Sequence, residues 1–167
     1  MTEDRSKQRD LLKAYLDQYD KLRRRMEALK WRLVDARDAL SCPVIQSGLS
    51  GTMPGGGKGG VNMGAAAPIL KEESLAERFE SERAQCAGTM REILDTLDLL
   101  PVSSKEREML EYRHIDGMQW KEICGKTKLS RATCLGRYER GLDRLLSFQR
   151  VQTHLAAFEA RRNGAGQ

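Results

Sequence analysis

The sequence has few aromatic side chains, few histidines and cysteines, and no long apolar run. Of its 167 residues, 5% are aromatic and 32% are charged. This composition is typical of a helix-rich chain that forms one small domain with an extension, and it disfavours a β-sandwich or a large enzyme core. No apolar stretch approaches the roughly 20 residues that span a bilayer, and residues 1–10 are too charged for a secretory signal. We therefore expect a cytoplasmic protein that makes no membrane contact.

The sparse cysteines and histidines exclude the usual metal-site spacings. The four cysteines lie far apart without a Cys-x-x-Cys pair, and only two histidines could supply imidazole. Structural zinc sites normally bring ligands in close pairs, so we expect free thiols in a reducing compartment, no metal and no cofactor. No nucleophile with a base and no acid–base pair stands at a usable spacing, so we expect no catalytic residues and no enzyme.

Positive charge gathers in one short segment. The net charge is +5, and residues 118–150 alone carry eight basic side chains against three acidic ones, whereas residues 70–100 carry four basic and eight acidic ones. A basic surface concentrated on a small segment is the electrostatic signature of a protein that binds the phosphate backbone of nucleic acid.

Residues 1–40 carry a heptad pattern that predicts a long helix with a coiled-coil seam. Its apolar or tolerated positions recur in steps of three and four, at Leu12, Tyr15, Tyr19, Leu22, Met26, Leu29, Leu33, Ala36 and Leu40. We interpret the run Arg23–Arg25 as a solvated face beside this seam. Residues 41–69 are rich in Gly, Pro and Ser, and this composition predicts a flexible linker.

A second heptad pattern predicts an amphipathic helix over residues 70–100. Its positions are Ala76, Phe79, Arg83, Cys86, Met90, Ile93, Leu97 and Leu100, of which only Arg83 is out of character. This helix is acidic where the first is basic, so the two could pair as an antiparallel hairpin. The pattern equally allows self-association with a second copy of the chain.

Residues 101–150 predict three short helices in a helix-turn-helix arrangement. Pro101 ends the preceding helix, Ser103–Ser104 supply the cap of the first, Gly117 supplies a turn, and Ser130 caps the last and longest. On the last helix an apolar face is predicted at Cys134, Tyr138, Gly141, Leu142 and Leu145. A basic face with small residues is predicted at Ala132, Thr133, Gly136, Arg137 and Arg140. Such a helix can enter the major groove of DNA. A plain three-helix bundle with a solvated basic face is the alternative.

The residues of this segment resemble a known family. Residues 101–146, with Ser104–Leu110, Tyr112–His114, Gly117–Ile123 and Leu129–Thr133, are similar to region 4 of the sigma-70 family, which reads the −35 promoter element. The whole chain resembles a group of small phage-encoded, sigma-like proteins of Gram-positive bacteria. That group is related in layout to late-transcription activators of the RinA and ArpU type. The shared features are a helical N-terminal half, a linker like Thr52–Gly56 and this C-terminal domain.

The resemblance implies a transcription regulator that binds double-stranded DNA and could contact RNA polymerase. It implies base-reading roles for Arg131, Ala132, Thr133 and Gly136, with Ser130 at the start of their helix. It also implies phosphate contacts from Lys121, Lys128, Arg137 and Arg140. The chain departs from the family where a turn glycine is replaced by Lys128, Gly125 falls inside the short helix, and Leu135 replaces a basic residue.

The sequence therefore predicts an all-α protein with long coiled-coil-like helices, a Gly-rich linker and a C-terminal helix-turn-helix domain. Residues 151–167 are expected to form the end of the last helix and a tail. The N-terminal half would form a homodimer or contact polymerase. Two alternatives remain: a non-catalytic coiled-coil assembly protein, and a phage DNA-packaging subunit that uses the same motif.

Overall fold

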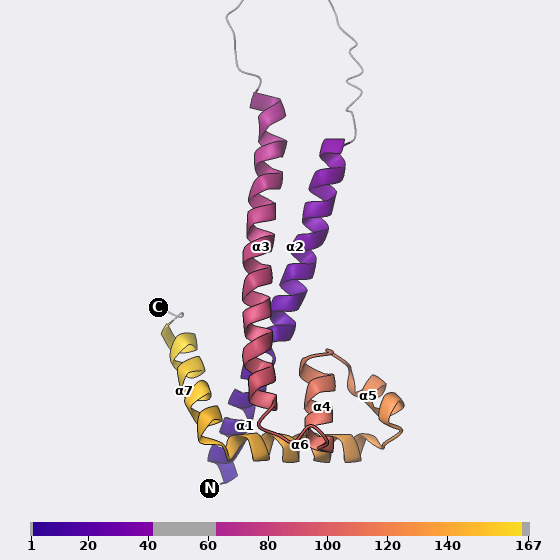
Figure 1. Ribbon diagram of the computed structural model, residues 1–167, viewed down its shortest axis with the longest axis vertical. Helices are drawn as coiled ribbons and strands as arrows, with labels where there is room; N and C mark the ends of the chain where they lie inside the picture. Colours follow the sequence, from indigo (N-terminus) through magenta and orange to yellow (C-terminus); the bar gives the residue numbers. More distant parts are fainter. Residues whose placement is uncertain (1, 42–62, 165–167) are drawn as a thin grey trace, which may run out of the picture. The chain divides into compact units, whose positions relative to one another are not determined.

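The computed structural model describes residues 2–41 and 63–164. Within these ranges all regular structure is α-helical and no strand occurs, which confirms the all-α class. The helices are α1 (Thr2–Leu16), α2 (Gln18–Ser41), α3 (Met63–Leu97), α4 (Lys105–His114), α5 (Trp120–Thr127), α6 (Arg131–Leu146) and α7 (Gln149–Gly164) (Figure 1). Most of the predicted linker, residues 42–62, lies outside the described residues.

The chain divides into two compact units. Unit 1 combines residues 1–23 with residues 85–167, and unit 2 comprises residues 24–84. Unit 1 therefore contains α1, the end of α3 and all of α4 to α7, whereas unit 2 contains most of α2 and the first part of α3. Unit 2 is thus inserted, along the chain, between the two stretches of sequence that form unit 1.

Unit 2 is a pair of antiparallel helices, α2 and α3, which Figure 1 shows side by side. An ion pair joins Arg37 Nε of α2 to Glu72 Oε1 of α3 at 2.7 Å, and a second joins Arg25 to Glu82. The basic first helix and the acidic second helix thus meet within one chain. The predicted seam differs at two places in this unit. Leu40 is exposed at the end of α2. Arg83 is also exposed, and Glu82 is buried instead, because Arg25 supplies the charge that lets a carboxylate lie there.

The predicted single helix over residues 1–40 is interrupted at Asp17, and α1 belongs to the core of unit 1. The interruption is slight, because the Asp17 amide still donates to Lys13 O at 2.9 Å. Leu12, Tyr15 and Leu16 are buried in the same cluster as residues of α4, α6 and α7. The first part of the heptad pattern therefore packs on the C-terminal domain, which the seam prediction did not anticipate.

α3 begins at Met63, seven residues before the predicted boundary at residue 70. The sequence Ala65–Ala67 explains the correction, because alanine has the highest helix propensity and extends the helix into the predicted linker. Pro68 lies inside the helix near this end, where it removes one hydrogen bond without ending the helix.

The core of unit 1 joins helices from both ends of the chain. Its buried members include Ile93 and Leu97 of α3, Met109 and Leu110 of α4, Ile123 of α5 and several residues of α6. α4 approaches α6 closely at Gly141, since a Cβ added there would lie 2.9 Å from Leu110 Cδ1. Cys124 and Cys134 form no disulfide bond.

The C-terminal segment is a separate helix, which corrects the prediction of a helix end and tail over residues 151–167. α6 ends at Leu146, where Ser147 Oγ donates to Arg144 O at 2.6 Å, a local bond that competes with helix continuation. Phe148 packs against the core, and α7 then buries Val151 and Leu155. The apolar side chains after the turn therefore complete the core.

Candidate nucleic-acid interface

The segment α5–turn–α6 presents the residues that the sequence assigned to DNA. The turn consists of residues 128–130, between Thr127 and Arg131. Lys128 adopts the left-handed conformation, with φ of 54°, and it is the one non-glycine residue with positive φ in the described chain. Leu129 packs against the core, which fixes the turn. Ser130 Oγ accepts from Thr133 N at 3.1 Å and caps α6, as predicted.

The inner face of α6 is buried as its 3.6-residue periodicity predicted. Cys134, Tyr138, Gly141, Leu142 and Leu145 are all buried, and Leu146 joins them. Buried side chains along the length of α6 hold the helix in a fixed rotation about its axis. The opposite face is therefore presented to solvent in one orientation.

The predicted contact residues lie mostly on the surface. The exposed ones are Lys121, Lys128, Ser130, Arg131, Ala132, Thr133 and Arg140, whereas Gly136 and Arg137 are half-buried. Among the described side chains, no carboxylate oxygen lies within 4 Å of the charged nitrogens of Lys121, Lys128 or Arg131. These three cations are therefore available to an external anion.

The two hydroxyl groups at the start of α6 bond to each other. Ser130 Oγ lies 2.8 Å from Thr133 Oγ1, in addition to its bond from the Thr133 amide. Ser130 therefore acts first as the helix cap. Arg131 and Ala132 lie between these two residues, and their side chains are exposed in the first turn of α6.

Acidic residues of α4 border the basic face, a feature that sequence reasoning missed. Glu106 Oε1 lies 3.7 Å from Arg140 Nε, and its other oxygen lies 3.9 Å from Arg144 Nη1. The nearest sequence signal is Gly141, a glycine on an apolar helix face that allows another helix to come close. The spacing along the chain gives no indication that Glu106 would be the neighbour.

A second carboxylate of α4, Glu108, is held by local bonds. It accepts from Lys105 Nζ and from the Tyr112 hydroxyl, each at 3.0 Å. These bonds, led by the one from Lys105, lower the pKa of Glu108, and the charge of Arg137 adds to the effect. Arg140 therefore lies next to a carboxylate and the charge of Arg137 acts on another, whereas Lys121, Lys128 and Arg131 have no such neighbour among the described side chains.

A buried histidine connects α6 to the junction of α1 and α2. His114 is 2% exposed; its Nδ1 lies 2.9 Å from Asp17 Oδ1, and its Nε2 lies 3.0 Å from the Tyr138 hydroxyl. The hydrogen bond from His114 lowers the pKa of Asp17, and burial raises the pKa of Tyr138. A neutral imidazole satisfies both partners when Nδ1–H donates to Asp17 and Nε2 accepts from Tyr138.

An ion pair fixes α1 against the far end of α6. Arg9 binds Asp143 through two nitrogens, with Nε at 2.7 Å from Oδ1, and Arg5 Nε lies 3.4 Å from the same oxygen. The bond from Arg9 lowers the pKa of Asp143. α1 thus contacts α6 through Asp143, which is not one of the residues predicted to contact DNA.

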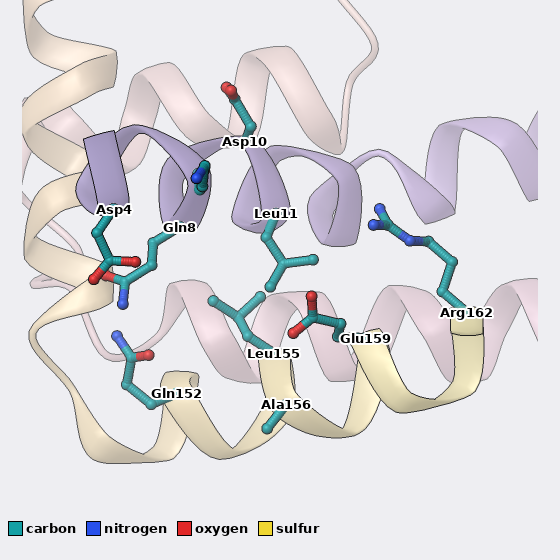
Figure 2. A pocket seen from close by; sticks show the side chains of 10 residues that line it. Asp4, Gln8, Asp10, Leu11, Gln152, Leu155, Ala156, Glu159 and Arg162 are labelled. Atoms are coloured by element: carbon teal, nitrogen blue, oxygen red, sulfur yellow. The ribbon is translucent and has the colours of Figure 1, made fainter. Parts of the chain in front are cut away.

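A groove of about 610 Å³ lies between α1 and α7 (Figure 2). Leu11 and Leu155 point toward each other across it, and Asp4, Glu159 and Arg162 stand around them. It contains side chains of both charge signs and none of the residues predicted to contact DNA. The groove is therefore separate from the candidate interface on α5 and α6.

Comparison with protein-family models, with curated proteins and with solved structures found no match. In residues 2–41 and 63–164, no helix combines the length and apolar character that a membrane span requires.

Proposed function

We propose that the protein is a DNA-binding transcription regulator that acts by binding rather than by catalysis. α5 and α6 form the helix-turn-helix, and α6 enters the major groove. The observation that carries the proposal is a set of exposed cations on α5, the turn and the start of α6, namely Lys121, Lys128 and Arg131, none of which has an ion-pair partner among the described side chains. Exposed cations of this kind can contact backbone phosphates, and they need no internal ion pair to be broken.

The shape of α6 supports the same proposal. Ala132 and Gly136 put no bulky side chain on the outward side of α6. A Cβ added at Gly136 would meet only Arg140 Nη1, at 3.8 Å. Small side chains let the helix backbone come close to base edges, where Arg131 can reach a guanine. The partial positive charge at the N-terminus of α6 favours the same end of the helix for phosphate contact.

The acidic border limits how the duplex can lie. Glu106 and Glu108 repel phosphates beside Arg140 and Arg137. We infer that the duplex contacts the first half of α6 most closely. Arg137 and Arg140 would then reach phosphates by moving away from these carboxylates, and their contribution should depend on salt.

The sequence resemblance adds the biological setting to this proposal. A sigma-70 region 4-like domain without a promoter-melting region would act as an accessory activator, with RNA polymerase as a partner. The N-terminal helices would then serve for dimerisation or for polymerase contact.

A salt titration of binding to random duplex DNA tests the proposal. Neutralising about four to six phosphates gives a slope of log K against log salt of about −4 to −5. The double variant Arg137→Ala, Arg140→Ala should lower the slope by up to about 2 and weaken binding about tenfold or more. The matched control is Arg161→Ala with Arg162→Ala, which removes the same charge from exposed positions of α7.

Two results would refute the proposal: no duplex binding by the wild-type protein at low salt, or equal losses in the α6 variant and in the α7 control. Selection from a random-sequence pool then measures sequence reading. An enriched motif that is lost with Arg131→Ala supports base readout, whereas binding without enrichment supports backbone contacts alone.

One observation favours a second candidate, a non-catalytic assembly protein that acts through unit 2. Of the large exposed hydrophobic side chains in the described residues, most lie in this unit: Trp31, Val34, Leu40, Ile69 and Leu70. Exposed apolar side chains gathered in one unit indicate a protein partner. Under this alternative, the Arg137→Ala, Arg140→Ala variant keeps full function and self-association.

A further inference from the structure

One exposed face of α2 in unit 2 carries a charge pattern that complements itself. Ala28, Arg32, Asp35 and Ala39 follow one another at steps of four, three and four, so they share one face of the helix. All four are exposed. The buried residues Leu29 and Leu33 lie on a different face, so this face is not part of the buried seam of α2.

The two charges on this face have no ion-pair partner. Arg25 and Arg37 of the same helix pair with carboxylates of α3, but no such pair involves Arg32 or Asp35 among residues 4–41 and 67–164. A second α2 that runs in the opposite direction would place Asp35 against Arg32 and Arg32 against Asp35. Two equivalent ion pairs would result, with alanines on either side of them.

The surroundings of the face are apolar and open. Trp31 lies on one flank and is 67% exposed, although tryptophan is the largest apolar side chain. The face itself borders a groove of about 770 Å³, which Arg32, Asp35 and Ala39 line together with Ala36, and whose other walls include Pro68, Lys71 and Leu75 of α3. The groove is open, so Arg32, Asp35 and Ala39 stay exposed beside α3.

From these observations we infer that this face binds a second copy of the chain, α2 against α2, in antiparallel orientation. Arg32 meets Asp35 of the second copy, Ala28 meets Ala39, and the alanines let the helices approach closely. By the two-fold symmetry, the two Trp31 side chains lie on the same flank, where they shield the ion pairs from water. A closed two-fold contact uses the same patch on both subunits, as this self-complementary face requires.

This inference deepens the dimer part of the proposed function, and its test does not require DNA. Sedimentation equilibrium of the full chain over a concentration series measures the dimer dissociation constant. Arg32→Asp and Asp35→Arg each place like charges opposite each other, and each should raise that constant about tenfold or more. The double variant Arg32→Asp, Asp35→Arg restores both pairs with exchanged signs and should dimerise like the wild type.

Lys30→Asp is the matched control, because it reverses an exposed charge outside this face of α2. Helical circular dichroism checks that each variant is folded. Trp31 supplies an independent signal in a Trp120→Phe background, since it is then the single tryptophan. Its fluorescence emission should shift to shorter wavelength as the concentration rises and the dimer forms.

Three results would each overturn the inference: a monomer at all concentrations, a dimer indifferent to Arg32→Asp, or a double variant no better than the single ones. The DNA salt titration separates this outcome from the proposed function. A monomer that binds duplex DNA removes only the dimer face, whereas a dimer that binds no DNA removes only the DNA-binding proposal.

Discussion

The same substitution, glycine to alanine, should have opposite effects on stability at two helical positions. Gly125 lies in α5, and a Cβ there would meet nothing within 4 Å. Alanine favours the helix over glycine by about 1 kcal/mol, so Gly125→Ala should stabilise the protein by about that amount. At Gly141 of α6, the new Cβ would lie 2.9 Å from Leu110 Cδ1 and 3.3 Å from the backbone oxygen of Glu106.

The contact at Gly141 cannot relax by a side-chain rotation alone, because the Glu106 oxygen belongs to the backbone of α4. Overpacking of this kind costs about 2 kcal/mol, which exceeds the helix gain of about 1 kcal/mol. Gly141→Ala should therefore destabilise the protein by about 1 kcal/mol. The two variants should differ by about 2 kcal/mol, or about 4–8 °C in Tm.

Urea unfolding followed by circular dichroism, together with a thermal scan, measures both variants against the wild type. Equal stabilisation by Gly125→Ala and Gly141→Ala would refute the close approach of α4 to α6. It would also remove the physical basis for placing Glu106 beside Arg140.

Three further predictions concern the turn and the two polar anchors of α6. Lys128 has a left-handed backbone, which costs a residue with a side chain about 1 kcal/mol, and Lys128→Gly removes this strain at the expense of some backbone entropy. Urea unfolding should therefore show a free energy of unfolding higher by about 0.5 kcal/mol. The salt slope of DNA binding should fall by about 0.9, because one phosphate contact is lost. The folded-state pKa of Asp143 is lowered by Arg9, so its contribution to stability is present above the ordinary aspartate pKa of about 3.9 and is lost as pH falls through the lower folded value. Asp143→Asn should therefore lose stability at neutral pH and show a weaker decline below about pH 4 than the wild type; parallel curves in acid urea titrations would contradict this. His114→Leu removes the partner of the buried Tyr138 hydroxyl and should cost about 2 kcal/mol, whereas Tyr138→Phe in the same background should recover part of the loss.

The features predicted correctly from the sequence are those determined by local interactions. The cap within Ser103–Ser104, which the structure shows to be Ser104, the cap at Ser130 and the buried face of α6 depend on residues within one or two helical turns. A period of 3.6 residues therefore identifies them. The interior positions Cys134, Tyr138 and Leu142 could be assigned without knowing what covers them.

The features that the sequence could not predict depend on which surfaces meet. A heptad pattern identifies an apolar face but not its partner, so the packing of α1 in the core of unit 1 was missed. In retrospect, α1 has a wider apolar face than the rest of the pattern, because Leu16 is buried beside Leu12 and Tyr15. A wide face is typical of a helix in a globular core, whereas a narrow seam is typical of a coiled coil.

The candidate interface also combines features set by the local sequence with a feature set by contacts between helices. The exposure of Lys121, Lys128 and Arg131 follows from their places in and beside α5 and α6. The acidic border at Glu106 depends on the α4–α6 contact, more than thirty residues apart in the sequence, and no local pattern reports it. Base reading by Arg131 and Gly136 remains a prediction.

The division of unit 1 into two stretches of sequence has a consequence for synthesis of the protein on the ribosome. Leu12, Tyr15 and Leu16 are made more than 120 residues before Leu142, Val151 and Leu155, which share their cluster. At about 5–20 residues per second, roughly 6 to 25 seconds pass between Leu16 and Leu142. Until α6 and α7 are made, α1 lacks the helices that it contacts most. A chain that stops before α7 would lack Val151 and Leu155 and leave part of this apolar face uncovered, so truncated products should be recognised by chaperones and proteases.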